Sequence, residues 1–440
     1  MPERPPRDMT VGVVGAGITG LALTHHLRER GVDAVAFEAS AEPGGVIRST
    51  TVDGRVLEHG PQRTRLTPEI ESLIEACGIE DDVRTADTDL PLYVYADGRL
   101  RQVPFSPREF LSTDLLSARG KLRMLAEPLT DGARDDETAA DYFVRKFGRE
   151  AYHNVIEPLF GGIYGSDPAE MPGKYALRTV SRMERSGSLV RAAVRRRLDG
   201  KERQPPVSFD DGMAQLPRAL YDHNAERVEL ETPVDGIAAA GDGYRLDTAG
   251  GSHAVDRVVL TARADVTAGL LSEVDPESAR ALRRLYYNPL AYVHLVSDAD
   301  PAGYGYQVRH DESLRTLGVT WNASLFDRDG VYTCFLGGMS DPGLVDRSET
   351  EIGRIAREEF ESVLGAPAEV INVTRHRRGI PAYDGSWTAM EAVDLPEGIT
   401  LASNYAGRMG VPARVREGKR LAERFASESG TGRAVAEATG

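Results

Sequence analysis

Cysteine is almost absent from this chain of 440 residues: Cys77 and Cys334 lie far apart, and neither has a second cysteine or a histidine at the spacing of a zinc motif. A disulfide framework is therefore not supported, and a reducing cytoplasm is the expected compartment. No apolar run approaches the length of about 18 residues that a membrane-spanning helix needs, and no apolar signal-peptide core follows the polar N-terminus. We expect a cytoplasmic protein, and peripheral attachment to the inner face of the membrane is left open.

Cations are outnumbered, and lysine is scarce among them. The chain has 53 Lys and Arg against 68 Asp and Glu, a formal net charge of −15, and only five of the cations are lysines. Nucleic acid is therefore not an expected partner, because phosphate binding relies on clustered cations. An acidic, lysine-poor composition is typical of a halophilic cytoplasm and also of a GC-rich genome, and both interpretations stay open. The arginine-rich stretch 182–203 is either a membrane-surface or substrate-steering patch or a solvated helix face.

Patterns for metal binding and nucleophilic catalysis are missing as well. The nine histidines form no HxH or HExxH spacing, so no metal site is expected. No serine lies in a nucleophile elbow. The chain is too long for one ordinary core, and its 41% of hydrophobic residues suffices for packed cores, so two or three domains are expected.

The N-terminus carries a dinucleotide-binding pattern. A short buried strand at 11–14 runs into the loop Gly15-x-Gly17-x-x-Gly20, and a helix follows that stops at Gly31. Gly15 allows a tight turn, Gly17 lets a diphosphate approach the backbone, and Gly20 lets the helix pack on the strand. A second strand ends at Glu38, whose carboxylate is placed to accept both ribose hydroxyls and disfavours a 2′-phosphate. The spacing predicts a Rossmann βαβ unit that binds an ADP-containing cofactor other than NADP.

The rest of the chain alternates between helical and strand-rich stretches. Expected elements are a helix at 68–78, a hairpin that turns at Asp97-Gly98, mostly helix over 108–200 with a glycine-rich break at 161–165, strands within 227–262 and 291–339, a helix at 349–364, a strand at 399–402 and a closing helix from Arg414. The predicted fold class is α/β, with a Rossmann-type FAD-binding domain interleaved with a mixed-sheet substrate domain and a helical subdomain. The predicted pieces are 9–72, 205–272 and 373–428 for FAD binding, 73–106 and 273–372 for the substrate sheet, and 107–204 for the helical subdomain.

The motif extends beyond the first glycines. After Glu38 come Gly44-Gly45-Val46-Ile47-Arg48 and Glu58-His59-Gly60-Pro61, and the extended pattern resembles the amine oxidase and protoporphyrinogen oxidase superfamily of FAD enzymes. The resemblance implies that the glycine pair and its arginine lie near the diphosphate and that Gly60-Pro61 lies by the flavin ring; the alternative is that these glycines only shape loops. The cofactor-binding residues it predicts are Gly15, Ala16, Gly17, Ile18, Thr19, Gly20, Glu38, Ala39, Gly45, Val46, Arg48, Gly60, Val234, Asn404, Gly410 and Val411.

A second stretch narrows the resemblance. Residues 157–168, EPLFGGIYGSDP, are similar to a segment of HemY-type protoporphyrinogen and coproporphyrinogen oxidases. Arg178 with Glu184, WNASLFDRDG with CFLGG at 321–338, IPAY at 380–383 and SNYAGRMGVP at 403–412 also resemble that family. The similarity covers about residues 10–425. It departs from the family at Leu92, where an arginine that pairs with a substrate propionate is common, and at Pro412-Ala413-Arg414, where Pro-Asp-Cys is usual.

The resemblance implies a porphyrinogen substrate, hydride transfer to FAD, and O2 as the acceptor. The implied substrate-binding residues are Gly162, Tyr164, Tyr304, Leu92 and Arg99, with Arg99 or Arg101 standing in for the missing propionate partner; each tyrosine is otherwise a packing residue. No catalytic side chain is expected, because the electrons of the pyrrole nitrogen assist loss of hydride. An amine oxidase or carotenoid-desaturase-like enzyme of the same fold, and a flavin-bearing porphyrin carrier without turnover, are the alternatives. Hand-over of the product to ferrochelatase and the oligomeric state are left open.

Overall fold

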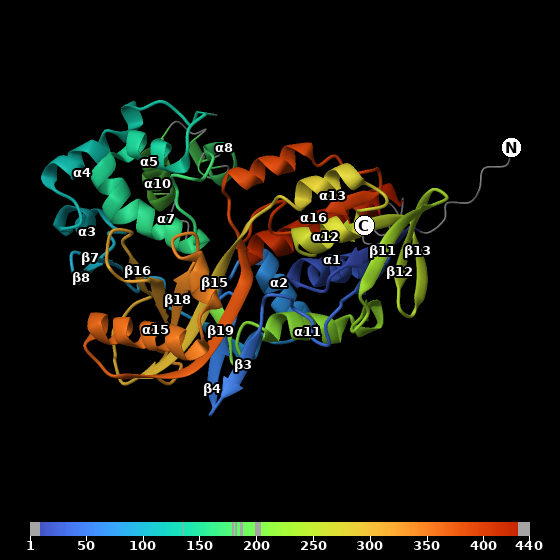
Figure 1. Cartoon of the computed structure of the whole chain (residues 1–440), viewed down its shortest axis with the longest axis horizontal. Helices are drawn as coiled ribbons and strands as arrows, with labels where there is room; N and C mark the ends of the chain where they lie inside the picture. The colour runs from blue at the N-terminus through green and yellow to red at the C-terminus, as the bar shows by residue number, and fades with distance from the viewer. Residues whose placement is uncertain are drawn as a thin grey trace.

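The structure is a computed structural model that describes residues 9–134, 136–177, 180, 183–184, 188–198 and 204–429. Three groups of elements lie side by side in Figure 1: a parallel sheet with its helices, a large mixed sheet, and a cluster of helices at the far end. The predicted α/β class is confirmed. Within the described residues, no helix has both the length and the apolar composition to cross a bilayer.

The parallel sheet is assembled from the two ends and the middle of the chain. Its order is β10 (Val228–Glu229), β2 (Asp33–Phe37), β1 (Thr10–Val14), β14 (Arg257–Leu260) and β20 (Ile399–Leu401), all parallel. The side chains of the central strands are buried between helices on one face and the antiparallel strands of residues 234–255 on the other. On one face α1 (Ile18–Glu29) packs against α16 (Val411–Glu428), where Gly418 would clash with the α1 backbone if it carried a Cβ atom. Helix α16 begins at Val411, three residues before the predicted start at Arg414.

The mixed sheet has seven strands. Its order is β19 (Ala368–Pro381), β15 (Tyr287–Ser297), β18 (Val331–Gly337), β17 (Thr316–Trp321), β16 (Gly305–Val308), β7 (Leu92–Ala96) and β8 (Arg99–Gln102). Only β16 and β7 pair in parallel. Asp97 and Gly98 have φ of 52° and 72°, which makes the predicted two-residue hairpin turn between β7 and β8. Helix α15 (Glu349–Leu364), predicted over the same residues, covers one face.

Strand β19 crosses a predicted boundary. It pairs with β15 as far as Pro381, so residues 373–381 lie in the mixed sheet rather than with the FAD-binding pieces. A continuous strand opposite the long β15 satisfies backbone groups that an earlier crossing would leave unpaired. The remaining domain boundaries stay predictions.

The helical cluster contains residues 161–165, where the sequence predicts an interruption of the helix. Instead, α7 (Glu157–Tyr164) continues through Gly161 and Gly162 and ends at Gly165, whose φ of +58° makes a left-handed C-cap. The prediction of a break was wrong because packing against neighbouring elements outweighs the low helix propensity of two glycines. The other helices of the cluster are α3 (Pro107–Ser112), α4 (Ala118–Leu125), α5 (Ala139–Phe147), α6 (Arg149–Ala151), α8 (Gly173–Ala176) and α10 (Leu189–Leu198), with η2 (Glu127–Leu129) and the π-helical turn η3 (Tyr152–Ile156).

Smaller elements connect these layers. They are β3 (Ser49–Val52), β4 (Arg55–Glu58), β5 (Thr64–Arg65), α2 (Pro68–Cys77), η1 (Glu80–Asp82), β6 (Val83–Thr85), β9 (Pro206–Phe209), α11 (Gln215–His223), η4 (Ala225–Arg227), β11 (Val234–Ala240), β12 (Gly243–Thr248), β13 (Gly251–Val255), α12 (Ala264–Leu270), α13 (Pro276–Leu282), α14 (Asn322–Phe326), η5 (Pro342–Asp346) and η6 (Gly385–Ala392). Glu58 and Arg328 form a buried ion pair of 2.9 Å that joins the end of β4 to the segment after α14.

Candidate active site

The glycine loop after β1 is shaped to receive a ligand. Gly15 has a φ of +105° and its N–H donates to the carbonyl oxygen of Phe37 at 2.8 Å. Gly17 is the N-cap of α1, and neither a capping side chain nor an acidic residue of the first turn occupies the helix N-terminus. A Cβ atom on Gly17 would lie 4.0 Å from its nearest neighbour, whereas one on Gly20 would lie 2.0 Å from the carbonyl oxygen of Gly15. Gly20 is thus required by packing, and Gly17 leaves space in front of the helix end.

The carboxylate of Glu38 lies at the same edge of the sheet. Its Oε2 accepts a hydrogen bond from the N–H of Ala16 at 2.9 Å, and its Oε1 accepts one from the N–H of Ser40 at 3.0 Å. The N–H of Thr232 donates to the carbonyl oxygen of Glu38 at 2.8 Å. This contact brings the segment leading to Val234 beside Glu38 and Ala39. The structure therefore groups the residues predicted to hold the adenosine end.

A second glycine pair faces the first loop. Gly17 and Gly44 form a parallel bridge, Gly45 has a φ of +62°, and Arg48 Nε donates to the carbonyl oxygen of Gly45 at 3.2 Å. The apolar side chain of Val46 is 62% exposed, which leaves a surface for a ring to cover. Gly60 differs from these residues, because a Cβ atom there would lie 2.0 Å from the carbonyl oxygen of Val46. At Gly60 the loop-shaping interpretation accounts for the glycine.

A second helix N-terminus is open at the C-terminal segment. Gly410 is the N-cap of α16, without a capping side chain or an acidic residue in the first turn, and a Cβ atom there would meet nothing within 4 Å. Behind it, buried Arg414 donates to the carbonyl oxygens of Ser403 at 2.9 Å and Arg408 at 2.6 Å. Arg414, at a position where the sequence departs from the resembled family, therefore braces the loop that carries Asn404, Gly410 and Val411.

These residues fit an FAD. The N-terminus of α1 offers unpaired N–H groups to a diphosphate, and that of α16, where Pro412 has no N–H, offers the N–H of Val411; both also present the positive end of a helix dipole. The Glu38 carboxylate suits ribose hydroxyls. The residue-by-residue contacts with the cofactor stay predictions.

The segment 157–168 meets two other predicted motifs. Met339 N–H donates to the carbonyl oxygen of Gly165 at 2.8 Å, and a Cβ atom on Gly338 would lie 2.7 Å from that oxygen. Ser166 Oγ donates to the carbonyl oxygen of Ala382. The glycines at 337–338 and the IPAY segment at 380–383, far apart in sequence, thus converge on the end of α7.

Aromatic side chains line this junction. The ring centroid of Tyr164 lies 5.0 Å from that of Tyr383, and the Tyr383 ring lies 3.8 Å from that of Trp387. Tyr383 has a φ of +51°, a conformation uncommon for a residue with a side chain. Burial raises the pKa of Tyr164, so its hydroxyl is neutral near pH 7. Tyr164 is half-buried in packing, which is the alternative considered from the sequence.

A cavity of about 220 Å³ opens beside α7. Its lining includes Glu157, Gly162, Asp167, Arg309, His310 and Arg315. A Cβ atom on Gly162 would lie 2.1 Å from Gln307 Oε1, so the close approach at this glycine is to a side chain of β16. Two histidines, which the sequence did not place here, come close: His310 lines the cavity, and His153 Nδ1 lies 3.1 Å from Glu157 Oε2.

Tyr304 lies at the other end of β16. Its N–H donates to the carbonyl oxygen of Pro91 at 2.7 Å, and the next residue, Gly305, pairs with Leu92. Arg99 and Arg101, proposed as substitutes for the missing arginine, are already paired with Asp114 and Asp97. Arg178 lies outside the described residues, as do residues 182, 185–187 and 199–203 of the arginine-rich stretch.

Arg63 is the cation that the sequence interpretation missed. Its guanidinium carbon lies 5.2 Å from the centroid of the Tyr304 ring, and no carboxylate of the described residues pairs with it. Burial lowers the pKa of Arg63 to about 10, so it stays charged at pH 7. Its only signal in the sequence is its place two residues after Gly60-Pro61.

Comparisons with known proteins agree with this geometry. The sequence profile of the family described as flavin containing amine oxidoreductase matches residues 18–424. The chain is 25% identical over 471 residues to protoporphyrinogen oxidase 2 of Arabidopsis thaliana, covering 94% of this chain and 93% of that protein. It is also 25% identical over 460 residues to the coproporphyrinogen III oxidase of Bacillus subtilis (strain 168), covering 93% and 96%.

Solved structures share the fold. A protein from Exiguobacterium sp. 255-15 has a TM-score of 0.78 at 24% identity, covering 96% of this chain and all of that chain. A triple mutant of putrescine oxidase has a TM-score of 0.73 at 18% identity, covering 96% and 99%. At these identities the likeness establishes the fold alone.

Proposed function

The chain belongs to the family of flavin-containing amine oxidoreductases, and on that premise we propose that it oxidises protoporphyrinogen IX or coproporphyrinogen III to the porphyrin in haem biosynthesis. It is an FAD-dependent oxidoreductase. The observation that carries the choice of substrate is the convergence of 157–168, 335–339 and 380–383 on the end of α7, since these segments are where the chain resembles porphyrinogen oxidases. The plant and Bacillus relatives support the same choice because they match over almost their whole length.

The side chains bind and orient in this proposal. A bound flavin would supply the acceptor for a hydride from the substrate and the route by which electrons reach O2. The open ends of α1 and α16 hold the cofactor, and the ring of Tyr304 offers a flat face to a macrocycle. No side chain is required as a general base, so Glu157 and Asp167 serve the cavity's structure and charge.

Arg63 is our proposed partner for a carboxylate arm of the substrate, in place of Arg99 or Arg101. Arg63 is charged and lies over Tyr304, whereas the other two arginines already pair with aspartates. A guanidinium forms two parallel hydrogen bonds with a carboxylate, which fixes the orientation of the arm. Bringing a carboxylate to this half-buried cation also offsets the cost of its burial.

Anaerobically prepared coproporphyrinogen III and protoporphyrinogen IX, mixed in air with the FAD-loaded protein, test the proposal. Porphyrin fluorescence should rise faster than in buffer with at least one of them, and the ratio of the two rates identifies the substrate. Absence of enzymatic fluorescence with both, together with flavin reduction by putrescine or benzylamine, would show an amine oxidase. Tight porphyrin binding without turnover would show a carrier.

The cellular setting is a further part of the proposal. The two cysteines form no disulfide, which supports the cytoplasm as the compartment of the protein. Peripheral contact with an anionic membrane is supported by the exposed apolar side chains Leu111, Leu122 and Leu129, at 73%, 70% and 87% exposure. The surrounding segment 107–204 carries 18 Lys and Arg against 15 Asp and Glu in an otherwise acidic chain. Sedimentation with anionic vesicles, and its loss in a Leu122→Gln, Leu129→Gln double variant, tests this; hand-over to ferrochelatase stays a prediction.

A further inference from the structure

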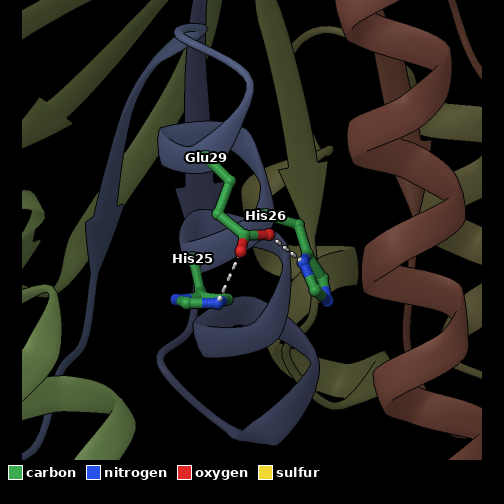
Figure 2. Close-up of side chains that lie close together, drawn as sticks. All are labelled: His25, His26 and Glu29. Atoms are coloured by element: carbon green, nitrogen blue, oxygen red, sulfur yellow. Dashed lines mark hydrogen bonds and ion pairs between the residues drawn. The ribbon is translucent and has the colours of Figure 1, made fainter. Parts of the chain in front are cut away.

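Two adjacent histidines and a glutamate meet on the last turns of α1, away from both sites described above. Figure 2 shows the Glu29 carboxylate between the two imidazole rings. His25 Nε2 lies 3.5 Å from Glu29 Oε1, and His26 Nδ1 lies 2.7 Å from Glu29 Oε2. One ligand atom from each of the three residues falls within 4.8 Å of the others. The helix creates this arrangement because residues three and four positions apart lie on one face.

The two imidazoles are buried on the packed side of α1. His25 and His26 are 3% and 4% exposed, between leucines and alanines of α1 that are fully buried. Of the two ring nitrogens on each histidine, His25 Nδ1 and His26 Nε2 have no hydrogen-bond partner among the described residues. The glutamate is different, because its side chain is 49% exposed and keeps the cluster open to solvent. These two nitrogens are turned away from Glu29, so His25 Nε2 and His26 Nδ1, which face the carboxylate, are the nitrogens placed to share an ion with it (Figure 2).

We propose that His25, His26 and Glu29 bind a divalent transition-metal ion of the Zn²⁺ type. Two imidazole nitrogens and one carboxylate oxygen are a donor set found in zinc sites. With metal–ligand bonds of about 2.0–2.2 Å, the donor atoms of a tetrahedral site lie about 3.3–3.6 Å apart. The two nitrogen–oxygen distances, to different oxygens of Glu29, are 3.5 Å and 2.7 Å, and the three ligand atoms lie within 4.8 Å of one another, so the side chains must draw together to close the site.

The surroundings select the class of metal. Mg²⁺ and Ca²⁺ require mostly oxygen ligands, and the cluster offers one carboxylate. Arg30 Nη1 lies 3.6 Å from Glu29 Oε2, and Arg28 directly precedes Glu29 in the sequence. These cations oppose an ion held by charge alone, so the bonds to nitrogen must carry the affinity. Burial lowers the pKa of both histidines, that of His25 to about 4, which leaves neutral rings able to coordinate.

A candidate for a fourth ligand lies on α11. The ring of His223, which is exposed at the end of that helix, lies 5.4 Å from the ring of His25. Arg28 already joins the two helices by donating to the carbonyl oxygen of His223. A metal ion that also takes His223 would join α1 to α11 on the outer side of the dinucleotide-binding unit. Its role is therefore structural.

Equilibrium dialysis of the FAD-loaded, full-length protein without a histidine tag tests the site. The protein is dialysed against ZnCl2 with a large excess of MgCl2, and bound zinc is measured by elemental analysis. We expect one zinc per chain, and affinity at least about tenfold lower in Glu29→Gln and in His26→Gln, since loss of even an outer-shell partner has effects of that size. His310→Asn, which removes an exposed histidine elsewhere, is the matched control and should bind like the wild type.

A second readout separates the site from scattered surface binding. Zinc should raise the thermal midpoint of the wild type and of His310→Asn but not of Glu29→Gln, because only a ligand of the native state stabilises it. Circular dichroism and FAD content confirm that each variant is folded. Equal zinc affinity in all four proteins, absence of zinc uptake, or displacement of zinc by the magnesium would each overturn the proposal. A smaller loss of affinity in His223→Asn supports the fourth ligand, and an unchanged affinity assigns that position to water.

Discussion

The dinucleotide end and the substrate end of the molecule are built in opposite ways. At the dinucleotide end the loop Gly15–Gly20 and Glu38 lie within 24 residues of chain and present mainly backbone N–H groups. At the substrate end, the tip of α7 meets segments about 170 and 215 residues further along the chain. A local site of this kind follows from turn and helix chemistry, whereas an assembled site depends on the whole fold. Substitutions should therefore separate cofactor binding from folding only at the dinucleotide end.

The largest expected effect is at Gly17. A valine there meets no protein atom closer than 4.0 Å at its Cβ, so Gly17→Val should fold but fill the space of the diphosphate and reduce bound FAD from one per chain to almost none. Gly20→Val should instead destabilise the fold itself, because its Cβ would lie 2.0 Å from the carbonyl oxygen of Gly15. Absorbance near 450 nm and thermal unfolding of the apoproteins check the pair. Recovery of NAD or FMN from the wild type would contradict the assignment.

The stability of the contact between His294 on β15 and Glu58 at the end of β4 should depend on pH. His294 is buried and its Nε2 donates to the carbonyl oxygen of Glu58 at 3.0 Å, while burial lowers its pKa from 6.5 to about 4. Its neutral form stabilises the fold above pH 6.5, and this contribution, up to about 3 kcal/mol, is lost as the pH falls toward 4. Nearby His59 and His376 also have lowered pKa values and act in the same direction.

Denaturant unfolding at pH 7.5 and pH 5 measures this change. The free energy of unfolding should fall in the wild type and fall less in His294→Gln. A stability that is flat over this interval in the wild type would show that these histidines do not titrate with unfolding.

The substrate end is tested at Arg63. Arg63→Met should raise KM for the porphyrinogen about 10–100-fold, with a smaller change in kcat, because a hydrogen bond to a charged group contributes about 1.5–3 kcal/mol. Arg99→Met is the control and should behave like the wild type, since Arg99 pairs with Asp114 at the surface. If KM instead rose in Arg99→Met and not in Arg63→Met, Arg99 would be the partner of the substrate carboxylate.

Thermal stability at different KCl concentrations tests the charge on the surface of the protein rather than the two sites. Outside segment 107–204 the chain has 35 Lys and Arg against 53 Asp and Glu, so self-repulsion should be strongest there and should be screened by KCl. If the composition is a halophilic adaptation, the thermal midpoint rises by several degrees between low and molar KCl. A midpoint that does not rise with salt favours genome composition as the origin of the bias.

The smallest expected effect is at the cavity carboxylates. Asp167→Asn and Glu157→Gln should leave most of the anaerobic rate of flavin reduction, because no side chain is proposed as an obligatory base. Stopped-flow absorbance measures this rate directly. A decrease of about a thousandfold in either variant, with folding and FAD content unchanged, would identify a general base. His153 and His310 belong in the same series, since the structure places both by these carboxylates.

The elements that the sequence predicted best are those with local causes. The first βαβ unit, the Asp97-Gly98 turn and helix 349–364 follow from periodicity, turn residues and caps within a few positions. The helix through Gly161 and Gly162 could not be predicted in that way, because it is stabilised by packing against β16 and the segments after β18 and β19. The path of β19 beyond residue 372 had the same cause, since its partner β15 begins 81 residues earlier in the chain.

The residues of the candidate site also fall into those with a local sequence pattern and those that only the fold brings together. Glycines and Glu38 were found from spacing, and the family resemblance supplied the residues of the 403–412 loop. Arg63 could not be found, because an arginine in a loop carries no pattern until the fold places it over Tyr304. Arg414 looked like a departure from the family until the structure placed its guanidinium against two carbonyl oxygens. His25, His26 and Glu29 were passed over because adjacent histidines match none of the common metal motifs.

The parallel sheet has a consequence for biosynthesis. Strand β1 leaves the ribosome early, yet its partner β14 lies about 250 residues later, a gap that takes on the order of ten to fifty seconds at ordinary rates of translation. The far edge strand β20 and the loop around Gly410 follow only at the end of the chain. FAD therefore cannot be fully enclosed until residues 399–412 have been made, and one edge of β1 stays unpaired until β14 has been made. Bound flavin should be absent from nascent chains that stop before residue 399.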